Sequence, residues 1–242
     1  MGKIKLRDKL NFSVPTGNFG DILAGYYAKR LGLPVGALIC ASNQNNVLSD
    51  FISTGVYDKR REFYKTNSPS MDILVSSNLE RLLNLLSLDE EKVAGYMADL
   101  NEKGIYSIDG EMLAKLKEEF SCGYCSDEDS LSTIGDVFKK YNYLMDPHTA
   151  VAWNVSDKFM AELTGPTVVL STASPYKFPA ACLKAIGVEP DADEFRVMEQ
   201  LNEVSSVPVP PALAALKDAP VLHTDVIEKD EMLSYVLNYL NQ

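Results

Sequence analysis

The feature that most constrains the fold of this chain is an alternation of short apolar runs with amphipathic stretches over its first 55 residues. Strands are predicted at residues 11–14 and 35–41, and helices at residues 21–31 and 47–53. The run 35–41 is apolar apart from one glycine, as in a strand that is covered on both faces. A strand–helix–strand–helix series closes through right-handed crossovers. The sequence therefore predicts the α/β class, with a mainly parallel sheet and helices on both faces.

The remainder of the chain is predicted to be mostly helical. Asp146 is a good N-cap, and Pro147 fits the first position of the helix that begins there. A β-branched strand is predicted at 167–170, and Pro208-Val209-Pro210-Pro211 reads as a stiff linker. Further helices are predicted at residues 79–86, 90–103, 112–120, 177–186 and 225–240. We expect one α/β domain over residues 1–242, with a helical insertion at about 78–143.

The charge balance limits the partners of this chain. It has 23 Lys and Arg against 34 Asp and Glu, a net charge of −11, which argues against nucleic acid or an anionic membrane surface as a partner. The longest apolar run, residues 35–41, is too short to span a bilayer, and the first residues lack the apolar core of a signal peptide. We expect a cytoplasmic protein that can form a homo-oligomer.

The cysteines and histidines offer little support for a metal or redox centre. Cys122 and Cys125 have the spacing of a redox pair or half a zinc site, but the two histidines lie far away in sequence. We interpret the pair as reduced thiols in a surface loop, with thiol redox chemistry as an alternative. The acidic run 127–129 is interpreted as a solvated loop, because no spaced ligand pattern follows it. No metal site is predicted.

The most informative motif lies between the first strand and the first helix, and reads Thr16-Gly17-Asn18-Phe19-Gly20-Asp21. Two glycines three residues apart let the backbone turn tightly and approach a ligand closely. The free N–H groups and the dipole of the following helix favour a bound anion. The motif matches neither the dinucleotide fingerprint nor the Walker A loop. On spacing alone a phosphate cradle and a plain turn remain open, and Asp21 is equally consistent with helix capping.

The amino-acid sequences of five segments, which form four motifs in order, resemble those of threonine synthase. This is a fold-type II enzyme family that depends on pyridoxal phosphate. The segments are residues 14–28, 41–48, 70–82, and 146–151 leading to 171–178. The resemblance covers essentially the whole chain. It implies the large-domain part of such an enzyme, which converts O-phospho-L-homoserine and water to L-threonine and phosphate.

The resemblance also implies which residues contact the cofactor. The backbone N–H groups of Gly17, Asn18, Phe19, Gly20 and Asp21 would bind the phosphate of pyridoxal phosphate. The hydroxyl of Thr172 would bind the pyridine nitrogen, at the end of a strand where open α/β sheets place ligands. A neutral hydroxyl does not force that nitrogen to be protonated.

One departure from the family pattern concerns the Schiff-base lysine, which in the family lies upstream of the phosphate loop in a Phe-Lys-Asp context. Lys3, Lys5 and Lys9 stand in no such context. We therefore expect a C-terminal portion of the enzyme whose N-terminal portion is a partner, with no catalytic residue in this chain. The chain alone is expected to lack threonine synthase activity, since a surface lysine without a lowered pKa is a poor general base.

Several residues near these motifs have a functional and an ordinary interpretation. His148 lies at an active-site edge or a domain contact, or is an ordinary polar residue of a first helical turn. Lys177 meets an anionic substrate or is a cation at a helix start, and Ser171 and Ser174 are weaker candidates than Thr172. His223 is interpreted as incidental and Trp153 as a packing residue.

Three hypotheses for function follow. The first is a part of threonine synthase. The second is a non-catalytic binding or interaction module derived from such an enzyme, which uses surfaces that a partner would cover. The third is thiol redox chemistry.

Overall fold

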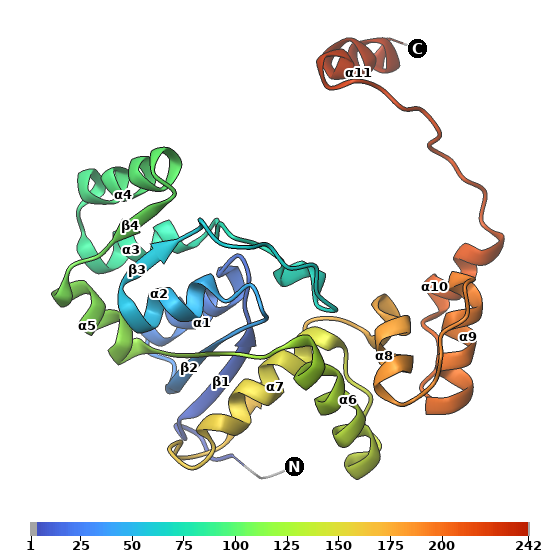
Figure 1. Cartoon of the computed structure of the whole chain (residues 1–242), viewed down its shortest axis with the longest axis horizontal. Helices are drawn as coiled ribbons and strands as arrows, with labels where there is room; N and C mark the ends of the chain where they lie inside the picture. Colours follow the sequence, from blue (N-terminus) through green and yellow to red (C-terminus); the bar gives the residue numbers. More distant parts are fainter. Residues whose placement is uncertain (1–3, 242) are drawn as a thin grey trace. The chain divides into compact units, whose positions relative to one another are not determined.

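The computed structural model of the protein describes residues 4–241, in two compact units (Figure 1). The first unit ends at Pro208 and the second begins at Val209, so the division falls in the predicted proline-rich linker. The sequence analysis predicted one domain over residues 1–242. The second unit contains α10 (Pro211–Ala214) and α11 (Met232–Leu240), and the latter is shorter than the predicted terminal helix. Among the residues described, no helix is long and apolar enough to cross a membrane.

A four-stranded parallel sheet lies at the centre of the first unit, in the order β5-β2-β1-β6. Its strands are β1 (Leu10–Pro15), β2 (Val35–Ser42), β5 (Phe120–Tyr124) and β6 (Thr167–Val169). The α/β class and the parallel sheet are confirmed. Because β1 and β6 are parallel neighbours, the segments that follow them emerge at the same edge.

Helices cover both faces of this sheet, and the alternation along β2 shows which helix covers which face. Leu38 and Cys40 pack with α1 (Gly20–Arg30) and α2 (Val47–Thr54) in one core cluster. Ile39 and Ala41 pack with α7 (Pro147–Phe159) in the other. In Figure 1, α7 lies along the strands at the opposite side from α1 and α2. The near-continuous apolar pattern of residues 35–41 is thus explained by burial on both faces.

The segment 78–143 differs from the predicted helical insertion, because it contains two strands. Its helices are α3 (Leu79–Ser87), α4 (Glu90–Glu102), α5 (Gly110–Glu119) and α6 (Asp127–Tyr141). Strand β4 (Ile105–Ser107) pairs antiparallel with β3 (Val56–Asp58), and their Tyr57 and Tyr106 rings stack at 5.3 Å. Strand β5 belongs to the main sheet, so this segment returns to the body of the unit.

The prediction that Cys122 and Cys125 lie in a surface loop is wrong. Cys122 lies in β5 opposite Cys40 of β2, and Cys125 is buried just after the strand. The acidic run that follows is the first turn of α6, where Ser126 caps the helix by accepting from the N–H of Asp129. Carboxylates are favourable at that end of a helix, so the run has a structural role there.

The last part of the first unit holds shorter helical elements. A 3-10 turn, η2 (Pro175–Lys177), and α8 (Pro179–Ala185) replace the single helix predicted at 177–186, because Pro179 starts a new helix. The helix α9 (Glu194–Ser205), which the sequence analysis did not predict, follows with Asp193 as its N-cap.

Candidate functional site

The ends of β1 and β6 open into one cavity. Its volume is about 320 Å³, and it is lined by residues from the loop after β1, the 3-10 turn η1 (Pro69–Met71), the start of α7 and the segment after β6. The lining residues are Pro15, Thr16, Gly17, Asn18, Phe19, Gly20, Asp21, Ile22, Ser70, Met71, His148 and Thr172. All six residues that the sequence analysis proposed for the cofactor therefore lie at one site.

The start of α1 presents unpaired backbone donors to this cavity. The first hydrogen bond of the helix runs from the N–H of Leu23 to the carbonyl of Phe19, so the N–H groups of residues 20–22 precede the helical ladder. No side chain caps this end, which excludes the capping role considered for Asp21. Donors of this kind at the positive end of a helix dipole are suited to an anion.

Phe19 turns the chain into α1 and fixes the loop to the core. Its φ of 60° lies in the left-handed region, which costs of order 1–3 kcal/mol for a residue other than glycine. Its side chain is 1% exposed and its ring packs against Phe120 at 5.4 Å. Burial of the ring offsets the strain of the backbone, so the loop has a defined shape.

Residues 76–78 hold this loop by hydrogen bonds to its carbonyls. The Ser76 hydroxyl donates to the Gly17 carbonyl at 3.0 Å, and the side-chain amide of Asn78 donates to the Asn18 carbonyl at 2.7 Å. The backbone N–H of Asn78 donates to the same carbonyl at 3.1 Å. Two loop carbonyls are thereby satisfied by the 76–78 segment. The sequence analysis noted the surrounding motif but assigned no role to Ser76 or Asn78.

Gly17 is required by close approach rather than by its backbone angles. A Cβ at this position would lie 3.1 Å from the Cα of Met71 and 3.2 Å from the carbonyl oxygen of Ser70. Both neighbours are backbone atoms, which cannot rotate away. The glycine therefore lets η1 pack directly against the loop.

Thr172 also lines the cavity, from the irregular segment after β6. Its side chain is exposed. The neighbouring serines have other positions. The hydroxyl of Ser171 lies 3.4 Å from that of Thr149, and Ser174 caps η2 by accepting from the N–H of Tyr176. Of the three hydroxyl residues proposed from the sequence, Thr172 is the one that lines the cavity.

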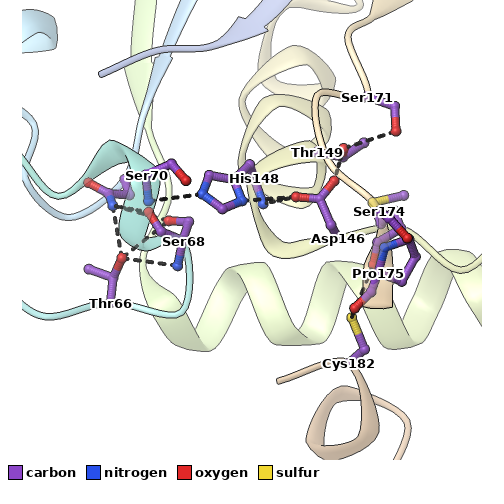
Figure 2. Close-up of polar contacts among 12 residues, drawn as sticks. Thr66, Ser68, Ser70, Asp146, His148, Thr149, Ser171, Ser174, Pro175 and Cys182 are labelled. Carbon is purple, nitrogen blue, oxygen red and sulfur yellow. Dashed lines mark hydrogen bonds and ion pairs between the residues drawn. The ribbon is translucent and has the colours of Figure 1, made fainter. Parts of the chain in front are cut away.

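His148 joins the start of α7 to η1 (Figure 2). Its Nδ1 lies 2.9 Å from Oδ1 of Asp146, and its Nε2 accepts from the backbone N–H of Ser70 at 3.1 Å. Burial disfavours the ionised form of Asp146, but hydrogen bonds from His148 and Thr149 outweigh it and hold the pKa of this carboxyl below its usual range. His148 is thus more than an ordinary polar residue of a first helical turn.

A buried amide fixes the segment that leads into η1. The side chain of Asn43, at the end of β2, donates to Oδ1 of Asp72 at 2.8 Å and to the hydroxyls of Thr66 and Ser68. Asn45 donates to the same carboxylate oxygen at 3.0 Å. The side wall of the cavity is therefore held by polar bonds on both sides of residues 69–71.

The other candidates from the sequence lie away from this cavity. Lys177 is exposed, with its ammonium 5.4 Å from the Phe178 ring centroid. His223 belongs to the second unit and is exposed. Trp153 packs against Tyr141 and lines a separate cavity of about 310 Å³ beside α7 and β6. Both thiols of the cysteine pair are free, and burial raises the pKa of each, that of Cys125 to about 12.

Comparisons with known proteins place the chain beside one enzyme family. Residues 149–233 match the family model described as Threonine synthase, C-terminal. The chain is 38% identical over 230 residues to human Threonine synthase-like 1, covering 94% of this chain and 29% of that protein. It is 43% identical over 181 residues to threonine synthase from Pseudomonas aeruginosa, covering 74% of this chain and 38% of that protein.

The fold agrees with a solved structure. The crystal structure described as PLP-bound threonine synthase from Brucella melitensis superimposes with a TM-score of 0.81 and 38% identity, over 97% of this chain and 46% of that one. This chain spans less than half the length of each of these three proteins.

Proposed function

We propose that this chain, which is homologous to the C-terminal portion of the threonine synthases, forms one wall of a pyridoxal phosphate site. In the complete enzyme this wall serves the conversion of O-phospho-L-homoserine and water to L-threonine and phosphate. The observation that supports it is the single cavity that brings Gly17, Gly20 and Thr172 together.

The residues of the cavity fit such a cofactor. A volume of about 320 Å³ lies in the range of small-molecule sites. The unpaired N–H groups at the start of α1 match a phosphate dianion, and the glycine at residue 17 lets backbone close around it. The exposed hydroxyl of Thr172, which lines the same cavity, matches an uncharged hydrogen-bond acceptor.

Each part of the chain then has a role. The amides of residues 17–21 hold the phosphate, and the bonds from Ser76 and Asn78 satisfy the carbonyls of Gly17 and Asn18. Thr172 donates to the pyridine nitrogen and orients the ring. When bound, pyridoxal phosphate withdraws electrons from the substrate carbons. A hydroxyl partner leaves that nitrogen unprotonated, which moderates the withdrawal.

The amine for covalent chemistry lies outside this wall. Lysine is absent from the described residues that line the cavity. We expect the 242-residue chain by itself to form no threonine from phosphohomoserine and pyridoxal phosphate. Threonine formation well above the rate with cofactor alone would contradict this, and Lys177 would be the first residue to replace.

Two measurements test the proposal. The chain is titrated with pyridoxal phosphate and with inorganic phosphate, and both are expected to bind in competition and weakly, since one wall leaves the site open to water. Threonine and phosphate release are then measured for the complete protein that contains these residues. A complete protein that binds the cofactor but is inert towards phosphohomoserine would support the non-catalytic binding module instead.

A further inference from the structure

The hydrogen bonds of His148 define which ring nitrogen carries the proton. The N–H of Ser70 can only donate, so Nε2 must offer its lone pair at 3.1 Å. Nδ1 lies 2.9 Å from the carboxylate of Asp146, which can only accept when ionised. The two partners together select the neutral imidazole with its proton on Nδ1 (Figure 2).

Both ring nitrogens are occupied, which limits what this residue can do. The side chain is 4% exposed, and the ring packs against Phe178 with centroids 4.7 Å apart. The Asp146 carboxylate also accepts from the backbone N–H of His148 at 2.9 Å and from the Thr149 hydroxyl. Both ring nitrogens are thus engaged by the protein itself, which favours a positioning role for His148.

His148 holds the backbone of η1, which packs against Gly17 in the loop of residues 16–21, hereafter the anion loop. Nε2 of His148 accepts a hydrogen bond from the backbone N–H of Ser70. The carbonyl oxygen of Ser70 lies 3.2 Å from the position of a Cβ on Gly17. The Cα of Met71 lies 3.1 Å from the same Cβ position. A displacement of this segment would remove the backing of Gly17 and change the position of the loop amides.

We infer that His148 is a positioning residue, whose Nε2 lone pair holds the Ser70–Met71 backbone against Gly17 and so sets the shape of the anion site. The identity of the anion as a cofactor phosphate rests on the proposed function. The tautomer and the contact with Ser70 do not depend on it.

The first test measures which ring nitrogen of His148 carries the proton in the folded chain. The chain has two histidines, and His223 lies in the second unit, so His223→Gln leaves one imidazole to observe. Long-range proton–nitrogen NMR spectra at pH 7.5 should show a protonated Nδ1 and an unprotonated Nε2. A proton on Nε2, or a charged ring, would overturn the inference.

The second test separates the bond to Ser70 from the bond to Asp146. In His148→Gln the longer side chain keeps an acceptor oxygen near the position of Nε2. In His148→Asn the amide keeps a donor near the position of Nδ1 but cannot reach Ser70. Titration with inorganic phosphate should give near wild-type affinity for Gln and about tenfold weaker binding for Asn. Equal affinities, or a loss for Gln alone, would show that the role is limited to pairing with Asp146.

A third readout keeps the inference falsifiable if phosphate does not bind. Hydrogen exchange of the Ser70 amide should be about tenfold faster in His148→Asn than in the wild type or in His148→Gln. Unchanged exchange would refute the positioning role, and failure of the wild-type chain to bind phosphate would refute the proposed function alone. Should His148→Asn not fold, the tautomer measurement on the His223→Gln protein still decides whether Nε2 offers its lone pair.

Discussion

Replacing Gly17 by alanine tests the packing of the anion loop. The added methyl group would lie 3.1 Å from the Cα of Met71 and 3.2 Å from the oxygen of Ser70, closer than nearly all real Cβ contacts. Since both are backbone atoms, η1 must move by a few tenths of an ångström. Overpacking of this kind costs about 1–3 kcal/mol in free energy of unfolding.

The same displacement should weaken anion binding. The loop amides would shift relative to one another, and the Ser70 N–H would be pushed from His148. A loss of about 1.4 kcal/mol in binding free energy corresponds to a tenfold rise in the Kd for phosphate. We expect a change of at least that size.

Gly95→Ala is the matched control. Gly95 lies inside α4 on the exposed surface, and a Cβ there would meet no atom within 4 Å. Alanine should stabilise this helix by up to about 1 kcal/mol. Urea unfolding followed by circular dichroism, together with phosphate titration, measures both variants. If Gly17→Ala unfolds at the wild-type urea concentration and binds phosphate equally well while Gly95→Ala behaves as expected, the steric argument is wrong.

Three further predictions follow from single contacts. Tyr57→Phe should lower the free energy of unfolding by about 1–3 kcal/mol and weaken phosphate binding, because the Tyr57 hydroxyl accepts from the Ser76 N–H at 2.8 Å and donates to the Leu74 carbonyl; an unchanged urea midpoint would contradict this. Asp146 has a lowered pKa, so its contribution to stability is present above its usual pKa of about 3.9 and is lost as the pH falls through the lower, folded value. Asp146→Asn should therefore unfold with a flatter dependence on pH below about pH 5, and an unaltered pH profile would show that the carboxyl is not ionised in the fold. Cys122 and Cys125 should react slowly with iodoacetamide at pH 7.5 and rapidly in urea, since burial raises the pKa of both thiols; rapid reaction of the folded chain would revive the redox hypothesis.

The elements that the sequence predicted well have strong local patterns. The runs 35–41 and 21–31 correspond within one residue at each end to β2 and α1, because an apolar run and a helical stripe are properties of neighbouring residues. Strands β3 and β4 have three residues each and pair across nearly fifty positions. Such short segments carry too little periodicity to be predicted. Strand β5 contains a serine, one cysteine and a glycine, and the spacing of Cys122 and Cys125 led to its interpretation as a loop.

The residues of the candidate site likewise divide into those that a local motif predicts and those that depend on distant contacts. The glycine loop before α1 was visible as a motif because its donors belong to consecutive residues. The role proposed for Thr172 came from the resemblance. Ser76 lies 59 residues from Gly17, and Ser70 lies 78 residues from His148. No pattern within a helix or strand reports a hydrogen bond over such separations, so the supporting residues became apparent only in the fold.

The anion loop combines features that are unfavourable without a ligand. Phe19 is held at positive φ, and the first N–H groups of α1 have no capping side chain. A fold selected only for stability would end this strand with a capped helix and a relaxed turn. Here the cost is offset elsewhere, by the buried ring of Phe19 and by bonds to the loop carbonyls from Ser76 and Asn78. Ser76 and Asn78 do not line the cavity, so their bonds hold the loop without occupying the proposed anion site. A preorganised site of this kind does not have to order the loop on binding, which would otherwise reduce affinity.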